Sequence, residues 1–523
     1  MAVVVAGRVA PMAVGQEEQT FAGRVWLGDD GTVDAVTRGR AKGPAGFSAA
    51  PVVDVGDDVV HPGFVDLHSH IAYNPLPLWT DPGQKAPYPH HDSWPNEPSY
   101  RPSIGWPAWT LLNRAPESVL AYVQVRALAG GSTAIQGWPG TSRRPANQLV
   151  RSVDDDQVGP LHDPIAVSAL TQKVDALTGR AARLGTGRSF VYHCAEGQPG
   201  TIVEREFDDL ARAGCLQPGL IAIHCCALDR AQFQRWQAAA AARPGDVTGT
   251  MVWSPFSNLW LYGLTSAVPD AREAGIDIAL GTDWGPSGTK NLLGEIKVAR
   301  IWSDHAGWDL SDLDLVHMIT AAPGDALARP WKQPVGRLVE GALGDVTVLT
   351  RRHPDVWRNA VTAREGDVAL VVVGGRPRYG TSGFMEGAGE PGTTSLRIGR
   401  QSRRLTLVRP DDPTRGWTWT DVMRRLDKVR AEAAATPPVP SAGRRRTAHR
   451  EVAGSADPPG TPPLEVDLDM PGGPGESAGP PPPGQTVEIA RIEPLHHDTR
   501  WLASLRGRGF HGGLLDGLRS YYR

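Results

Sequence analysis

The first residues that could do chemistry are His68 and His70, two histidines two positions apart after the apolar run 63–67. Alternate residues of a β-strand share one face, so both imidazoles leave the strand end on the same side. This spacing suits two ligands of one metal ion, and it equally suits a strand that merely ends in polar residues. The residues at the other strand ends decide between these interpretations.

Three further apolar runs also end in residues that can bind a metal. The run 190–193 ends in His193, with Glu196 three residues later, the run 220–224 ends in His224, and the run 276–282 is followed by Asp283. In a parallel α/β barrel the functional groups come from the C-terminal ends of the strands. One isolated histidine of this kind is more often structural. Four such strand ends together favour one shared site.

Three neutral imidazoles and one carboxylate form a ligand set for a first-row divalent ion and leave a coordination position open for water. The predicted set is His68, His70, His193 and Asp283. Such an ion lowers the pKa of its bound water from about 16 to about 7. Glu196 is then the candidate proton shuttle, and His224 is either a further ligand or a stabiliser of the forming oxyanion.

The elements that must position these residues alternate between strands and helices along 61–334, which predicts parallel strands with crossover helices. Seven strands are expected at 64–67, 132–137, 165–169, 190–193, 220–224, 249–253 and 276–282. An eighth in 147–158 would complete a (β/α)8 TIM barrel, so the predicted fold class is α/β. Helices are expected at 116–129, 171–184, 201–213, 229–242, 268–274, 292–302 and 310–328.

Both flanks of the predicted barrel contain short strands, within 1–60 and again at 344–350 and 366–374. We expect 1–60 and 335–410 to form one composite β-sandwich domain, because the first flank could hardly complete a sheet alone. A helix capped by Thr420 is expected within 411–436. Residues 437–485 are rich in proline and glycine and predict a linker. The apolar residues of 486–523 predict a C-terminal tail that docks on the main body.

Composition excludes several classes of protein. The chain has 523 residues, a net charge of −3 and 40% hydrophobic residues. This is enough apolar material for a core and offers no chain-wide attraction to nucleic acid or anionic membranes. The four cysteines lack CxxC spacing and are expected to be buried free thiols. With neither a signal peptide nor a membrane span recognisable, we expect a cytoplasmic protein with a small-molecule substrate, and the sequence leaves a homo-oligomer open.

Several motifs taken together resemble the amidohydrolase superfamily. They are PGFVDLHSH at 62–70, YHCAEG at 192–197, His224, WSPFSNLWLYG at 253–263 and GTDWGPSG at 281–288. The HxxE spacing of His193 and Glu196 is similar to that of the adenosine, cytosine and guanine deaminases and the triazine hydrolases. The segment PVGRLVEGALGDVTVL at 334–349 looks like the return of that family's chain into its β-sandwich. The resemblance covers residues 1–375.

The resemblance implies a role for each matching residue. It implies that His68, His70, His193 and Asp283 bind one zinc or iron ion, that Glu196 shuttles protons, and that His224 orients or polarises the attacking hydroxide. Asp283 would also hold this nucleophile by a hydrogen bond. Ser257 and Asn258 lie in a segment resembling one of the guanine deaminases and triazine hydrolases, and we expect them to contact substrate. Gln136 and Trp138 end the second strand and either contact substrate or pack in the core.

The implied activity is hydrolytic deamination of a planar nitrogen heterocycle by a metal-bound hydroxide. Hydrolysis of a cyclic amide, displacement of another leaving group and a catalytically inactive scaffold remain alternatives. A two-metal site would need a carboxylated lysine, for which Lys173 is the nearest candidate, but a solvated helix lysine is favoured there. A nucleic-acid site at 444–450 is disfavoured, because this basic run lacks interleaved aromatic residues. The segment 71–113 contains Trp79, Trp94, Trp106 and Trp109 and is expected to influence the choice of substrate.

Overall fold

The computed structural model describes residues 2–139, 141–142, 144–154, 174–242, 248–390, 392–412, 414–435, 464, 484–505, 511 and 513–522. The predicted strand 165–169, Lys173 and all but three residues of the predicted linker 437–485 lie outside these ranges.

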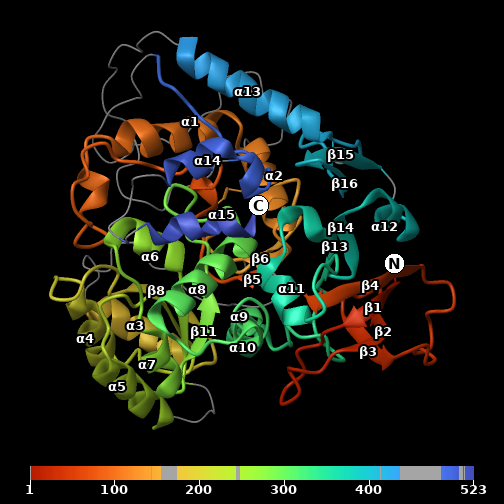
Figure 1. The fold of residues 1–523 in the computed structure, drawn as a ribbon, viewed down its shortest axis with the longest axis horizontal. Coiled ribbons are helices and arrows are strands. Elements are labelled where there is room, and N and C mark those ends of the chain that lie inside the picture. The colour runs from red at the N-terminus through yellow and green to blue at the C-terminus, as the bar shows by residue number, and fades with distance from the viewer. Residues whose placement is uncertain are drawn as a thin grey trace.

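A nine-stranded sheet joins the two flanks of the chain, in the order β15-β16-β14-β13-β12-β4-β1-β2-β3 (Figure 1). The first flank supplies β1 (Val3–Val9), β2 (Phe21–Leu27), β3 (Val33–Arg38) and β4 (Val52–Pro62). The second supplies β12 (Val346–Leu349), β13 (Val368–Val373), β14 (Arg376–Gly380), β15 (Thr393–Ile398) and β16 (Gln401–Thr406). The flanks meet where β4 runs antiparallel to β12, with Val60 opposite Val348. The division of the chain into domains stays a prediction.

Seven strands of the α/β part lie parallel in two sheets. The first contains β5 (Phe64–Asp66), β6 (Ser132–Ile135) and β7 (Arg151–Ser152). The second contains β8 (Phe190–Cys194), β9 (Leu220–His224), β10 (Thr250–Trp253) and β11 (Asp277–Leu280), in the order β11-β10-β9-β8. A parallel bridge between Ser69 and Asp283 joins the two sheets. The α/β class with a β-rich part is thus confirmed, while closure into an eight-stranded barrel stays a prediction.

Apolar side chains from this strand set pack in one buried cluster. It includes Val65, Ala134, Val153, Val191, Ile221, Val252 and Ala279. The strand β7 lies within 147–158, where the sequence predicts the eighth strand. Short apolar strands whose side chains meet in this way hold the strand ends, and therefore the polar residues that follow them, at one side of the sheets.

Most of the expected crossover helices are present, with boundaries shifted by a few residues. They are α2 (Pro116–Ala129), α3 (Val174–Leu184), α4 (Glu204–Arg212), α5 (Arg230–Ala241), α7 (Val268–Glu273) and α8 (Leu292–Ala306). The sequence did not predict α1 (Trp106–Arg114) or α6 (Pro255–Tyr262) as helices. Proline in the first turn of both helices is compatible with their starts, because the first turn leaves N–H groups unused.

The single helix predicted at 310–328 is wrong. The structure has two helices there, α9 (Asp312–His317) and α10 (Ala321–Trp331). The carbonyl of Met318 accepts a hydrogen bond from the Leu280 N–H at 2.8 Å, and that of Ile319 accepts one from the Val65 N–H at 2.9 Å. These two carbonyls bond to strand backbone instead of continuing a helix, so the helix is interrupted between them and Ala321.

The second flank also contains α11 (Val356–Thr362), α12 (Ser382–Gly387) and α13 (Trp419–Ala435). The expected cap of α13 is corrected from Thr420 to Thr418, whose Oγ1 accepts the N–H of Asp421 at 3.1 Å. The C-terminal tail forms α14 (Thr499–Ser504) and α15 (Leu518–Tyr521). It reaches the α/β part, where the Ala490 N–H donates to the carbonyl of Pro75 at 2.7 Å.

Candidate active site

Four predicted site residues lie at or just after strand ends. His68 follows β5, His193 and His224 lie in the last two positions of β8 and β9, and Asp283 follows β11. The backbone turns sharply at these ends, with φ of +52° at Ala195, +68° at His224 and +57° at Asp283. Left-handed backbone costs about 1–3 kcal/mol at a residue other than glycine, and it concentrates at functional sites.

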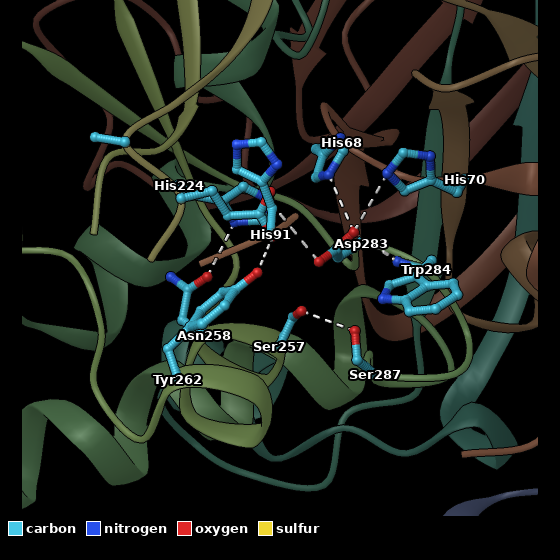
Figure 2. A network of polar contacts seen from close by, with 12 residues as sticks. His68, His70, His91, His224, Ser257, Asn258, Tyr262, Asp283, Trp284 and Ser287 are labelled. Carbon is cyan, nitrogen blue, oxygen red and sulfur yellow. Dashed lines mark hydrogen bonds and ion pairs between the residues drawn. The ribbon is translucent and has the colours of Figure 1, made fainter. Parts of the chain in front are cut away.

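Asp283 lies at the centre of the histidine cluster (Figure 2). Its Oδ1 is 3.1 Å from Nε2 of His68 and 3.5 Å from Nε2 of His70, and its Oδ2 is 4.0 Å from Nε2 of His224. Two triplets, His68 with His70 and Asp283 and His68 with His193 and His224, each have ligand atoms within 4.8 Å of one another. Ligands of one zinc-sized ion are about 3–4 Å apart, so these atoms fit a shared divalent metal.

The charge states of the cluster also fit a metal. Burial lowers the pKa of His224 to about 3 and, together with the neighbouring histidines, lowers the pKa of His193 well below its ordinary value. Burial opposes ionisation of Asp283, but the surrounding histidines hold its pKa far below the usual range. Within the described part of the chain, Nε2 of His193 has no hydrogen-bond partner. Neutral imidazoles and an ionised carboxylate are the forms that bind metals.

Gln136 orients the first histidine of the cluster. Its Nε2 donates to Oδ1 of Asp154 at 3.0 Å, so its Oε1 is the atom that faces Nδ1 of His68 at 3.2 Å. An amide oxygen can only accept, so Nδ1 of His68 carries a proton, and Nε2 of His68 faces the cluster, 3.1 Å from Oδ1 of Asp283. Such outer partners fix the tautomer and the ring orientation of metal-ligating histidines.

Asn258 does the same for His224. Its Nδ2 donates to Oγ1 of Thr265 at 3.2 Å, which leaves Oδ1 to accept from Nδ1 of His224 at 2.9 Å. Nε2 of His224 is therefore unprotonated and faces Oε1 of Glu196 at 3.6 Å. This arrangement allows His224 to bind a metal, and the geometry keeps both of its predicted roles open.

The carboxyl group of Glu196 is held by one oxygen. Oε1 accepts a hydrogen bond from the hydroxyl of Tyr262 at 2.6 Å, and Oε2 has no partner among the residues that the structure describes. Burial raises the pKa of Glu196 to about 8. A carboxyl group with a raised pKa and one unengaged oxygen beside a metal-ligand cluster is suited to carry a proton.

The chain is similar to known deaminases. It is 26% identical to a 5-methylthioadenosine/S-adenosylhomocysteine deaminase of Moorella thermoacetica, over 64% of this chain and 84% of the relative. Its fold is similar to a zinc-bound adenosine deaminase of Xanthomonas campestris, with a TM-score of 0.53, 15% identity and coverage of 72% and 92% of the two chains. A guanine deaminase of C. acetobutylicum with bound guanine gives a TM-score of 0.52 at 14% identity, with coverage of 72% and 100%. No family model matches the chain.

The chain is therefore similar in sequence to deaminases and shares the fold of the solved deaminases. The relatives share the fold, and the motifs that carry the resemblance converge on one cluster of ligand atoms. The four cysteines are buried free thiols, as predicted. No described helix has the length and apolar character needed to cross a membrane.

The residues predicted to contact substrate have other partners in the structure. Oγ of Ser257 lies 2.8 Å from Oγ of Ser287, and both side chains are fully buried. The backbone N–H of Trp138 donates to Asp154 at 2.6 Å, and its half-buried ring packs against the core. Their roles in substrate binding, like those of Gln136 and Asn258, stay predictions.

The tryptophan loop, residues 71–113, packs over the end of β8. His90 forms an antiparallel bridge with Gly197, and the N–H of His91 donates to the carbonyl of Glu196 at 3.1 Å. A Cβ atom at Gly197 would lie 2.5 Å from the carbonyl oxygen of Pro89, so this close approach requires glycine. The loop is thereby fixed to the backbone of the candidate proton shuttle.

Sequence reasoning missed Glu206, which lies on α4. Its Oε1 is 2.8 Å from Nε2 of His91, and its Oε2 accepts the N–H of Ala195 at 2.6 Å. It therefore links the tryptophan loop to the strained residue between His193 and Glu196. The sequence did contain a signal for this role, because Glu206 falls on the apolar face of an amphipathic helix. A buried carboxylate there needs a hydrogen-bonding partner.

Proposed function

We propose that this chain is an amidohydrolase that catalyses the hydrolytic deamination of a planar nitrogen heterocycle, with one zinc or iron ion bound by His68, His70, His193 and Asp283. The proposal is supported above all by one observation. The shuttle candidate Glu196 has one carboxyl oxygen, Oε2, without a partner among the described residues, and it lies beside a buried cluster of histidines and Asp283. A (β/α)8 barrel is the architecture proposed for 61–334, and the packing of all seven described strands in one cluster supports it.

Each residue has a defined task in the proposed reaction. A divalent ion held by these four ligands would supply a water molecule that loses its proton near neutral pH. Glu196 takes up that proton and delivers it to a ring nitrogen of the substrate. Asp283, which stays ionised, accepts a hydrogen bond from the nucleophile and keeps it in place. His224, held in one tautomer by Asn258, binds the ion or polarises the nucleophile. The proton of the added hydroxyl group then passes to the amino group, the C–N bond breaks, and ammonia leaves a carbonyl group on the carbon that was attacked.

The relatives suggest the first substrates to try. Adenine nucleosides such as 5-methylthioadenosine and S-adenosylhomocysteine come first, because the name of the relative from M. thermoacetica includes both. Guanine and other heterocycles follow, because the fold is similar to a guanine deaminase. Cyclic amides and chlorinated triazines belong in the same screen, because the same site chemistry would release those leaving groups.

The test combines two measurements on the purified full-length chain. Metal analysis should give about one zinc or iron ion per chain, and ammonia release should be detected for at least one heterocycle. Glu196→Gln should reduce turnover by at least about 100-fold, the usual contribution of a general acid–base group, while the metal content is unchanged. Glu386→Gln, at an exposed position on α12, is the matched control and should behave like the wild type. Full turnover in Glu196→Gln would overturn the shuttle role.

A further inference from the structure

We propose that Tyr262 positions the proton shuttle Glu196, and that Trp94 of the tryptophan loop completes this arrangement. The proposal rests on the proposed function, because it assigns a task to residues that act through Glu196. Tyr262 and Trp94 are 1% exposed. Figure 2 shows the hydroxyl of Tyr262, from α6, directed into the site.

The directions of the hydrogen bonds follow from the chemistry of the groups. The indole Nε1–H of Trp94 can only donate, and it lies 3.1 Å from the hydroxyl oxygen of Tyr262. The single hydroxyl proton of Tyr262 is then left for Oε1 of Glu196 at 2.6 Å. The chain of donors therefore runs one way, from Trp94 through Tyr262 to Glu196.

This direction determines which oxygen of Glu196 carries a proton. Oε1 accepts from Tyr262, and Nε2 of His224, at 3.6 Å from the same oxygen, has no proton to donate. When Glu196 is protonated, the proton must therefore be on Oε2, the oxygen that has no partner among the described residues. The hydrogen bond from Tyr262 thus makes the two carboxyl oxygens of Glu196 inequivalent, and only Oε2 carries the transferred proton.

Helix α6 sets two site residues at once. Asn258 and Tyr262 are four residues apart and so lie on one face of the helix. The first orients His224 through Nδ1, and the second orients Glu196 through Oε1. A single rigid helix therefore sets the relative placement of both groups, which a loop would define less well.

Trp94 brings the tryptophan loop into this arrangement. Its ring stacks on Trp284 with centroids 4.9 Å apart, and Trp284 is the residue after Asp283. The N–H of Trp284 donates to Oδ1 of Asp283 at 2.8 Å. Trp94 therefore reaches the shuttle through its N–H group and the metal-ligand cluster through its ring. The tryptophan loop must therefore be packed in this position for Oε2 of Glu196 to be placed correctly.

The test is a double-mutant cycle on the holoenzyme with Tyr262→Phe and Trp94→Phe. Both variants keep an aromatic ring and lose one polar group. Tyr262→Phe should lower kcat by about 10–100-fold, with KM and metal content nearly unchanged. Trp94→Phe should give a smaller loss of kcat, and adding it to Tyr262→Phe should cause no further loss, because it acts through Tyr262. Trp302→Phe removes an indole N–H that has no partner among the described residues, and it is the matched control.

A second readout does not depend on activity. In protein labelled with 15N-tryptophan, the indole resonance that disappears in Trp94→Phe should shift in Tyr262→Phe and should stay in place in Glu386→Gln, a change at an exposed position on α12. Independent, additive losses of kcat would overturn the proposal, as would wild-type kcat in Tyr262→Phe or an unshifted indole resonance. If the wild type deaminates no heterocycle, the proposed function fails, and the resonance still tests the chain of hydrogen bonds.

Discussion

Nζ of Lys290 lies 2.6 Å from Oδ2 of Asp498, and both side chains are almost fully buried. The same ammonium donates to the carbonyls of Arg491 and Glu493 at 3.0 Å each. Lys290 lies between Asp283 and α8, whereas its three partners belong to the C-terminal tail. The segment that carries a proposed metal ligand is thus tied to a part of the chain about two hundred residues away.

Breaking this pair should destabilise the protein. Lys290→Met leaves the Asp498 carboxylate buried without its partner, and we expect a loss of about 3–5 kcal/mol in the free energy of unfolding. The double change Lys290→Met with Asp498→Leu should recover much of that loss, because it removes both buried charges. Urea unfolding measures the difference, with the exposed pair residue Lys428→Met as control. Equal losses in the single and double variants would contradict the pair.

Asn258 should control the activity of His224 by fixing its tautomer. Asn258→Ala removes the acceptor for Nδ1–H, so the ring loses its fixed tautomer and orientation. We expect kcat/KM to fall by about 10–100-fold. Steady-state kinetics together with a thermal unfolding curve test this. A fall in melting temperature that alone accounts for the lost activity would assign Asn258 to stability.

His91 should make stability depend on pH. Burial lowers its pKa, but the hydrogen bonds to Asp92 and Glu206 outweigh burial and raise the pKa to about 10, against 6.5 as its ordinary value. The folded state therefore binds the extra proton, and the stabilisation is complete below about pH 6.5 and is lost as pH rises toward 10. Melting temperatures of the wild type and His91→Gln should differ most near pH 6 and converge near pH 10. A difference that is constant over this range would refute a protonated His91.

Metal removal should lower both activity and stability. A ligand that binds only the folded state at 100 times its dissociation constant adds about 2.7 kcal/mol to the free energy of unfolding. We expect dialysis against a chelator to lower the melting temperature, and zinc or ferrous iron to restore it. His193→Ala should already show the lower temperature and should not respond to added metal. An unchanged melting temperature in the dialysed wild type would argue against a metal bound by this cluster.

The sequence is informative about the site for a simple physical reason. Histidine and aspartate at the ends of apolar runs are conspicuous, and parallel strands place their C-terminal ends together. The roles of Glu206 and Tyr262 could not be found in this way, because they depend on which face of α4 and α6 turns toward the site. The orienting role of Gln136 depends on its hydrogen bond to Asp154, which follows a different strand, β7.

The errors in the fold have the same origin. The apolar residues of 310–328 recur with a helical period, so the sequence predicts one helix there. The pattern cannot show that the carbonyls of Met318 and Ile319 accept hydrogen bonds from the strand backbone, which interrupts the helix. The cap at Thr418 instead of Thr420 depends on a side-chain contact with Asp421. Local patterns determine which elements form, whereas tertiary hydrogen bonds determine where they stop.

The position of β4 in the nine-stranded sheet has a consequence for biosynthesis. One edge of β4 can pair with β1 soon after both leave the ribosome, but the other edge pairs with β12, which is made nearly three hundred residues later. At about 5–20 residues per second, that edge waits on the order of 15–60 s. An unpaired strand edge is a template for aggregation. During synthesis this edge of β4 is therefore exposed to aggregation until the second flank emerges, and a chaperone that binds the edge would protect the nascent chain.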